Sequence, residues 1–310
     1  MSLDPQNQFV LDMIKASGRP PFHTLTPAEA RAASAASRPI MSPDPAPVAE
    51  LRDFDAGGVP VRLYRAAGAA SDEVLPVLIY YHGGGWVIGD LDSHDSVCRV
   101  FANSARCCVV SVHYRLAPEH RFPAAVDDSA AATRWLIEHA ASLKIDPRRV
   151  AVGGDSAGGN LAAVMAIMAR DGTLPPIGFQ VLIYPATEMT ATQPSYERIT
   201  EGYVLTATTM KWFREHYITD RKDWTDWRAS PLRAASLEGV APAIVLTANY
   251  DPLCDEGAEY ARRLEREGVR VTHVHFSDQM HAFLTMGRII RASGVALDMM
   301  SAALRANWSV

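Results

Sequence analysis

The chain has 310 residues, a hydrophobic content of 48% and a formal net charge of −5. This composition allows a sizeable core, and the mild acidity gives no electrostatic reason to expect nucleic acid or an anionic membrane as a partner. The sequence shows no apolar run as long as a membrane span, no secretory signal and no CxxC spacing among its four cysteines, so we expect a cytoplasmic protein without a metal site.

Residues 1–50 are predicted to form an appendage of helices. Apolar residues at positions 9, 10, 13 and 14 make one helical stripe. The segment TPAE at 26–29 has the pattern of a capping box with proline in the first turn, which predicts the start of a second helix. A proline-rich segment at 42–47 ends this part of the chain. We therefore divide the chain into cap helices over 1–50 and a catalytic domain over 51–310.

Strands dominate the pattern from residue 51. Segments 51–56 and 61–66 flank two glycines, which predicts an antiparallel hairpin. Six near-continuous apolar runs follow, and runs of this kind are typical of parallel strands buried on both faces; they cover 75–81, 107–114, 150–153, 179–184, 243–248 and 271–276. Helix-like segments separate most of them, for example 124–143 and 256–267. The pattern predicts an α/β fold whose eight-stranded, mostly parallel sheet carries helices on both faces.

The connection between residues 184 and 243 is too long for a structureless loop. Segment 207–217 has a helical apolar face, so we predict a cap insertion at about 187–230 that joins residues 1–50 over the carboxyl edge of the sheet. Large apolar side chains are the candidates for binding a substrate there: Phe22, Trp86, Trp212, Phe213 and Tyr217.

The segment GDSAG at 154–158 matches G-x-S-x-G between a predicted strand and a predicted helix. That context is typical of a nucleophile elbow, a strained turn that exposes a reactive serine hydroxyl. The alternatives are a structural turn and a dinucleotide-binding loop, but the glycines do not form G-x-G-x-x-G. We therefore predict Ser156 as a nucleophile.

The segment HGGGW at 82–86 follows the strand at 75–81. Consecutive glycines at a strand end leave backbone N–H groups uncovered, and such donors can stabilise the oxyanion of acyl transfer. Such a set of donors is called an oxyanion hole. Its remaining donor is the backbone amide of the residue after the nucleophile, which here is Ala157. His82 is predicted to orient the loop rather than to react.

A serine nucleophile needs a base and a carboxylate that orients it, in the chain order Ser, Asp or Glu, His. Asp251 follows the strand at 243–248, and His281 comes shortly after the last strand. Their rivals have simpler explanations. His273 and His275 alternate within a strand, His216 lies on the cap helix, and Asp255 stands at a helix start.

Together these motifs resemble the bacterial hormone-sensitive-lipase-like family of α/β-hydrolase esterases, which adds YRLAPEH at 114–120 and DPL at 251–253. The resemblance implies the α/β-hydrolase fold, a triad of Ser156, Asp251 and His281, and an oxyanion hole made of the amides of Gly84, Gly85 and Ala157. Two residues depart from the family, which usually has glycine where this chain has Asp278 and Ala282.

The expected activity is hydrolysis of short- to medium-chain carboxylic esters through an acyl-enzyme intermediate. We expect a small-molecule ester as the partner, no organic cofactor, and no nucleic acid or membrane. Three alternatives stay open: an amidase or peptidase with the same machinery, a small-molecule binding protein, and a structural protein. A homodimer is one option for the oligomeric state.

Overall fold

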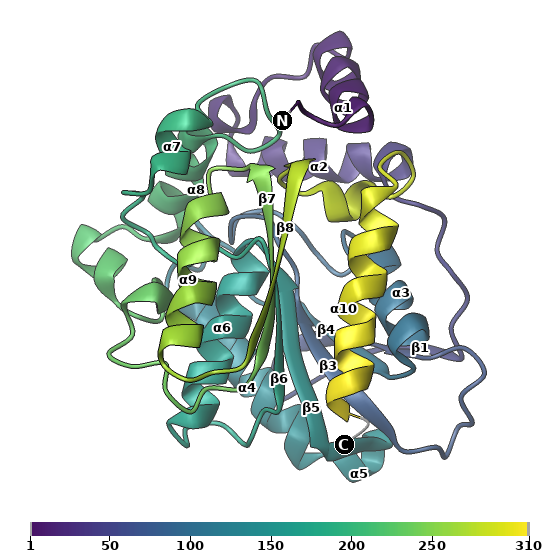
Figure 1. Cartoon of the computed structure of the whole chain (residues 1–310). Coiled ribbons are helices and arrows are strands. Elements are labelled where there is room, and N and C mark those ends of the chain that lie inside the picture. The colour runs from purple at the N-terminus through teal and green to yellow at the C-terminus, as the bar shows by residue number, and fades with distance from the viewer. Residues whose placement is uncertain (1, 309–310) are drawn as a thin grey trace.

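The computed structural model describes residues 2–308, which form one eight-stranded sheet in the order β1-β2-β4-β3-β5-β6-β7-β8 (Figure 1). β1 and β2 pair antiparallel, as do β2 and β4, and the other neighbours are parallel. The predicted mostly parallel sheet is therefore confirmed. Its strands are β1 (Glu50–Asp55), β2 (Pro60–Arg65), β3 (Leu75–Tyr81), β4 (Cys108–Val112), β5 (Ile145–Asp155), β6 (Phe179–Ile183), β7 (Ala243–Tyr250) and β8 (Val271–Met280).

Helices cover both faces of the sheet, as the strand composition requires. Along β3, Val77 and Ile79 belong to one hydrophobic core, while Leu78 and Tyr80 belong to the other. Alternate side chains thus point to opposite faces, and both faces are apolar. One face carries α3 (Asp95–Ala105) and α10 (Ala292–Trp308); the other carries α4 (Ala124–Glu138), α6 (Ala157–Arg170) and α9 (Cys254–Arg266), with the short α5 (Ala140–Leu143) at the lower edge (Figure 1).

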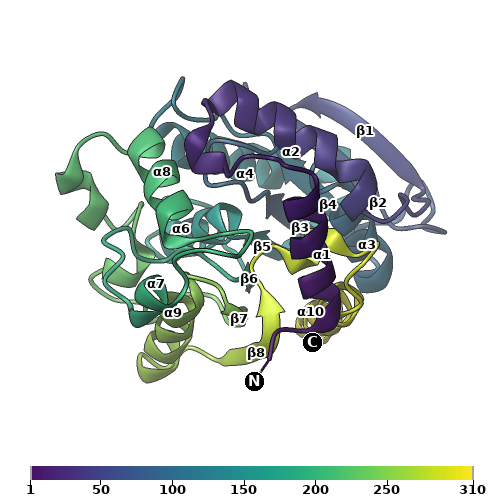
Figure 2. The same ribbon diagram turned by 90° about the horizontal axis from the view of Figure 1, so that it is seen from above.

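Two separate parts of the chain lie over the carboxyl ends of the strands (Figure 2). The N-terminal part holds α1 (Pro5–Ala16), the single turn η1 (Phe22–Thr24) and α2 (Pro27–Met41). The other part lies between β6 and β7 and holds α7 (Pro194–Arg198), α8 (Ala207–Tyr217), η2 (Arg221–Thr225) and η3 (Pro231–Arg233). His23 and Thr209 link the two parts, with Nδ1 3.4 Å from Oγ1.

Local signals in the sequence explain where the N-terminal helices begin. The Thr26 side chain accepts from the amide of Glu29, and the Glu29 carboxylate accepts from the amide of Thr26, so both halves of the capping box form. Asp4 caps α1 in a similar way. The exact limits of the cap, 1–50 and about 187–230, stay predictions.

Three elements differ most from the predicted pattern. β5 begins at Ile145, five residues before the predicted run at 150–153. The helix expected over 124–143 is interrupted at His139, which separates α4 from α5. β8 continues beyond residue 276 to Met280, which pairs with Tyr250 of β7, and the last two residues of the strand are buried. This extension places His281 directly at the strand end. Among the described residues, no helix is long and apolar enough to cross a membrane.

Candidate active site

Ser156 occupies a sharp turn between β5 and α6, with a φ of 56° in the left-handed region. Such a conformation in a residue other than glycine costs roughly 1–3 kcal/mol and persists only where its surroundings enforce it. The amide of Ser156 donates to the carbonyl of Ile183 on β6 at 2.8 Å. A Cβ at Gly158 would lie 1.8 Å from the carbonyl oxygen of Tyr81, so only glycine lets the turn approach β3 this closely.

His281 joins Ser156 to Asp251. Its Nδ1 lies 2.6 Å from Oδ2 of Asp251, and its Nε2 lies 3.0 Å from Oγ of Ser156. Because a carboxylate can only accept, the neutral imidazole carries its proton on Nδ1, and the lone pair of Nε2 faces the serine hydroxyl. All three side chains are buried. The structure thus brings together the three residues that the sequence singled out.

Asp251 is held rigidly at the end of β7. Its side chain is fully buried, and its Oδ1 accepts a 2.8 Å hydrogen bond from the amide of Leu253. The rival carboxylate Asp255 lies in the first turn of α9, 3.7 Å from the guanidinium of Arg198. The rivals His273 and His275 both contact the hydroxyl of Thr247, at 2.9 and 3.0 Å.

The two residues that depart from the family pattern, Asp278 and Ala282, lie on either side of His281. Ala282 adopts the left-handed conformation that favours glycine, with a φ of 65°. The backbone therefore follows a glycine-like path, at a cost of about 1–2 kcal/mol for the alanine. Asp278 lies within β8, and its carbonyl accepts a 2.9 Å hydrogen bond from the amide of Asp4. This bond ties the N-terminal part of the chain to the strand that carries His281.

The glycine-rich loop after β3 has backbone amides available for an oxyanion. Gly84 and Gly85 have φ values of 123° and 57°, and a Cβ at Gly84 would lie 2.1 Å from the carbonyl oxygen of Ile88. Within residues 2–308, their amides donate to no protein acceptor. Ala157 opens α6, where the first amides lack acceptors within the helix and carry the positive end of its dipole.

Asp155 and His82 hold this loop in place. Oδ1 of Asp155 accepts from the hydroxyl of Tyr80 at 2.9 Å and from the amide of Gly83 at 3.0 Å. Burial alone would raise the pKa of Asp155, but His94, 2.9 Å away, and Tyr80 hold it below its ordinary value. Burial lowers the pKa of His82 to about 3, so its ring is neutral and its Nδ1–H donates to the carbonyl of Gly83.

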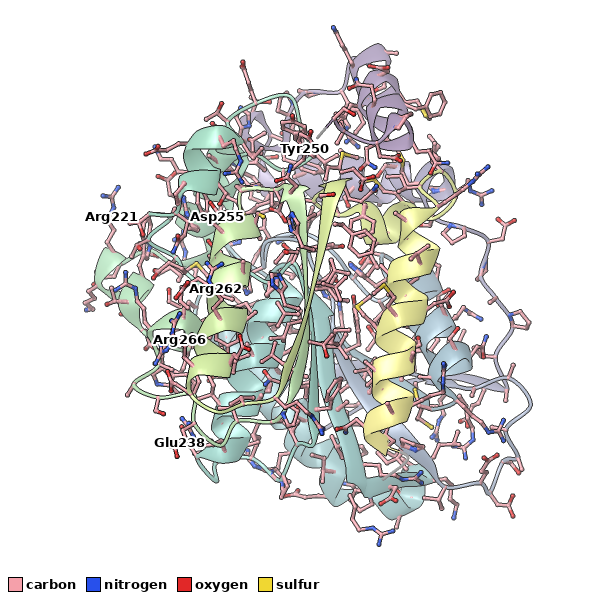
Figure 3. The ribbon with its side chains drawn as sticks, viewed as in Figure 1. Arg221, Glu238, Tyr250, Asp255, Arg262 and Arg266 are labelled. Atoms are coloured by element: carbon pink, nitrogen blue, oxygen red, sulfur yellow. The ribbon has the colours of Figure 1, made fainter. Side chains whose placement is uncertain are left out.

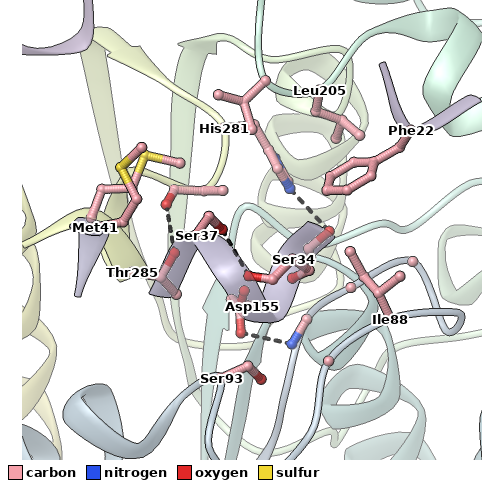
Figure 4. A pocket seen from close by; sticks show the side chains of 18 of the residues that line it. Phe22, Ser34, Ser37, Met41, Ile88, Ser93, Asp155, Leu205, His281 and Thr285 are labelled. Carbon is pink, nitrogen blue, oxygen red and sulfur yellow. Dashed lines mark hydrogen bonds between the residues drawn. The ribbon is translucent and has the colours of Figure 1, made fainter. Parts of the chain in front are cut away.

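A cavity of about 170 Å³ opens onto Ser156 and His281. Helix α2 forms one wall and presents Ser34, Ser37 and Met41, while Phe22 and Leu205 lie beside His281 (Figure 4). A helix in this place was predicted as part of the cap, but which of its side chains face the cavity was not, because short polar side chains on an alanine-rich helix are equally typical of a solvent-facing surface. Further lining residues that the sequence did not indicate are Met210, Thr285 and Met286.

Arg31 connects α2 to the loops beside the cavity through hydrogen bonds. Its Nε donates to the carbonyl of Val87 and its Nη2 to the carbonyl of Ala117, both at 2.8 Å. Its guanidinium also forms a two-point ion pair with Glu119, at 2.9 and 2.6 Å. The position of the cap helix is thereby linked to the loop that contains Gly84 and Gly85.

Of the aromatic residues predicted to bind substrate, Phe22 and Phe213 line the cavity. Trp86 is instead fully buried and stacks on Tyr217 of α8, with ring centroids 4.5 Å apart and an interplanar angle of 1°. Trp212 packs against the ring of His216 at 4.4 Å. The cavity lining does not include Trp86, Trp212 or Tyr217. These three side chains pack against other aromatic rings instead. Within the described residues, no group of three or more His, Cys, Asp or Glu side chains could hold a metal ion.

Several known proteins with similar sequences are named as esterases or ester hydrolases. The model of a family described as alpha/beta hydrolase fold matches residues 78–285. Ethyl acetate hydrolase of Pseudomonas putida is 41% identical over 316 residues, covering 98% of this chain and 99% of the relative. Carboxylic ester hydrolase LipN of Mycobacterium tuberculosis is 44% identical over 261 residues, covering 82% of this chain and 68% of the relative.

Solved structures agree over nearly the whole chain. An ester-hydrolase from the metagenome of Lake Arreo, complexed with a derivative of bipyridine phosphonate, has a TM-score of 0.95 at 43% identity and covers 99% of this chain and 100% of that one. A thermostable esterase from Pseudomonas putida has a TM-score of 0.94 at 34% identity, covering 99% and 98%. This chain therefore belongs to the alpha/beta hydrolase fold family, in its hormone-sensitive-lipase-like branch.

Proposed function

We propose that this protein is a carboxylesterase that hydrolyses short- to medium-chain esters, with Ser156 as nucleophile, His281 as base and Asp251 as the orienting carboxylate. The observation that carries the proposal is the hydrogen-bonded series from Asp251 through His281 to Ser156. The names of the relatives, an ethyl acetate hydrolase and a carboxylic ester hydrolase, support the same activity.

Acylation begins when Oγ of Ser156 attacks the ester carbonyl and its proton passes to Nε2 of His281. Asp251 stabilises the imidazolium that forms, because its carboxylate accepts the Nδ1–H. The carbonyl oxygen becomes an oxyanion, which the amides of Gly84, Gly85 and Ala157 would bind. One preorganised donor of this kind typically accounts for about 10²–10³ in kcat.

The tetrahedral intermediate collapses when the alcohol leaves with the proton from Nε2 of His281. An acyl group then remains on Ser156. Water attacks this acyl-enzyme while His281 again takes the proton, the acid leaves, and the serine hydroxyl is restored. Ser156, His281, water and the ester account for every bond and proton in these steps, so the proposed mechanism needs no metal ion and no organic cofactor.

The cavity supports a preference for short chains. It is small, at about 170 Å³, and the cap lines it with the side chains of Phe22, Leu205, Met210 and Phe213. A covered apolar pocket of this size buries a short acyl chain and has little room for a long one. We therefore expect a preference for acyl groups of roughly two to eight carbons, a range that follows the family resemblance and ordinary pocket sizes.

A panel of p-nitrophenyl esters from acetate to palmitate tests this proposal, with p-nitroanilides of the same acids alongside. We expect kcat/KM to be highest between acetate and octanoate, and the anilides to react far more slowly. Faster turnover of palmitate than of butyrate would contradict the chain-length preference. Equal rates on esters and anilides would favour the amidase alternative, and binding without turnover would favour a binding protein.

Location and assembly stay predictions. All four cysteines are buried and free, which is consistent with the proposed cytoplasmic location. Cell fractionation would test the location, and size-exclusion chromatography with light scattering would test whether the protein is a homodimer.

A further inference from the structure

The active-site cavity adjoins a second, outer cavity of about 820 Å³ under the N-terminal part of the chain. Four residues line both cavities: Ile14, Arg19, Phe22 and Val204. Three of them are apolar, so Arg19 is the only charge at this shared boundary. Arg19 lies in the short connection between α1 and η1.

Arg19 lacks the partner that the other charged groups of the active-site cavity have. Arg38 forms an ion pair with Asp90, and Asp155 is bonded to Tyr80 and the Gly83 amide. Within residues 2–308, by contrast, no carboxylate lies within 4.0 Å of the Arg19 guanidinium.

The surroundings of Arg19 are partly apolar. Its guanidinium carbon lies 5.4 Å from the centroid of the Phe22 ring, which itself lies beside His281 (Figure 4). Burial lowers the pKa of Arg19, and no acid opposes that effect. An arginine side chain remains charged under all ordinary conditions, so the boundary between the two cavities holds a cation without an ion-pair partner. The carboxylates of Asp12 and Glu201 line the outer cavity only.

We propose that Arg19 is a specificity-determining residue that binds a carboxylate at the end of the substrate remote from the ester bond. The proposal rests on the esterase function proposed above and names its substrate class: esters that also carry a free carboxylate, such as monoesters of dicarboxylic acids. A guanidinium presents two parallel N–H donors to a carboxylate, and partial burial strengthens such a pair relative to one in open water.

The carboxylate could belong to either half of the ester, so the test has two arms. The first uses ethyl monoesters of succinic, glutaric and adipic acid, in which the acyl half carries the charge. The second uses acetyl esters of ω-hydroxy acids, in which the alcohol half carries it. Each substrate is paired with its terminal carboxamide, which has the same shape without the charge. All are assayed by pH-stat at pH 8, where the carboxylates are ionised.

The readout is the ratio of kcat/KM for each carboxylate to that for its carboxamide. In the wild type we expect the ratio to reach about 10 in at least one arm, which corresponds to about 1.4 kcal/mol. It should fall to about 1 in Arg19→Gln, and it should decrease in 0.5 M NaCl because salt screens partly exposed charges. Lys15→Gln is the matched control, since Lys15 lines the outer cavity alone and the variant removes the same charge.

Three results would overturn the inference: a wild-type ratio near 1 in both arms, an Arg19→Gln ratio equal to the wild-type ratio, or an equal loss of the ratio in Lys15→Gln. A purely structural role for Arg19 would slow both members of each pair together and leave their ratio unchanged. Failure of the proposed esterase function is a distinct result, because then the carboxamide esters would not be hydrolysed either.

Discussion

Arg31 on the cap helix α2 donates a 2.8 Å hydrogen bond to the carbonyl of Val87, in the loop that holds Gly84 and Gly85. The amide of Val87 in turn donates to the carbonyl of Gly84 at 3.1 Å. A shift of Val87 would therefore move the glycine-rich loop whose amides we propose to bind the oxyanion. We therefore expect the cap to affect catalysis through the position of this loop as well as through the cavity wall.

Arg31→Gln should lower kcat about tenfold with little change in KM, because small displacements of stabilising groups weaken transition-state binding selectively. The control is Thr26→Ala, which removes the capping box of the same helix and costs about 1 kcal/mol of stability without touching Val87. Steady-state kinetics and thermal midpoints of both variants decide the question. If Thr26→Ala loses as much kcat as Arg31→Gln, Arg31 only stabilises the helix.

Asp251→Asn should lower kcat by about 10⁴ while the protein remains folded, since an asparagine at this position favours the wrong imidazole tautomer. Asp255→Asn is the matched control, because Asp255 is near enough in sequence to be its rival but lies on α9 (Figure 3). There its carboxylate is 3.7 Å from the guanidinium of Arg198. The kcat of this control should stay within about threefold of the wild type, as for the loss of a weak, partly exposed ion pair. The assignment fails if Asp255→Asn is the variant that loses catalysis.

Ala282 follows His281 in the left-handed conformation, so its side chain limits the loop. A β-branched residue is strongly disfavoured there. Ala282→Val should lower both the thermal midpoint and kcat, because relief of the strain displaces His281. Ala282→Gly should retain both, since glycine adopts this conformation freely. A valine variant with wild-type kcat and midpoint would show that the loop does not depend on this conformation.

Glu256 on α9 predicts a pH dependence of stability. Its Oε1 accepts from the amides of Thr187 and Glu188, at 2.6 and 3.1 Å, and burial raises its pKa to about 8. The folded state therefore favours the protonated acid. The resulting stabilisation is complete below the unfolded pKa of about 4.3 and is lost as the pH rises through about 8.

Glutamine cannot ionise, so the stability of Glu256→Gln should not decrease with rising pH through ionisation at this position. Its free energy of unfolding relative to wild type should increase from pH 5 to pH 8, as measured by urea denaturation. Each pKa unit corresponds to about 1.4 kcal/mol. Glu259→Gln on the same helix is the control, because Arg266 and Arg262 hold the pKa of Glu259 low and no such increase should occur. A constant difference between Glu256→Gln and wild type would contradict the raised pKa.

The sheet could be predicted from the sequence because buried parallel strands need apolar residues on both faces, which leaves continuous runs such as 75–81 and 179–183. Ser156, Asp251 and His281 could be found because each follows a strand, so that the topology itself gathers them at one edge. The limit of β8 was missed, because residues 277–280 are polar or mixed and their pairing with β7 depends on a register shift after Ala248.

The cavity lining was harder to predict. Tyr217 and Phe213 lie one helical turn apart on α8, yet Phe213 faces the cavity and Tyr217 stacks on Trp86. Which of two apolar side chains on one helix points inward depends on how the helix rests on the glycine-rich loop. A Cβ at Gly85 would lie 2.2 Å from the Phe213 ring, so this fit involves a loop more than a hundred residues away in sequence. No local pattern contains that information.

Covalent labelling can show whether Ser156 is the single nucleophile of this protein. The protein is treated with a p-nitrophenyl phosphonate, the bound label is counted by intact mass, and its position is found by peptide mapping. We predict one label per chain, on Ser156, with complete loss of esterase activity. Ser156→Ala should take up no label and should lose about 10⁶ in kcat, because the members of a triad act as a unit. A label on any other residue, or substantial ester hydrolysis by Ser156→Ala, would contradict the account.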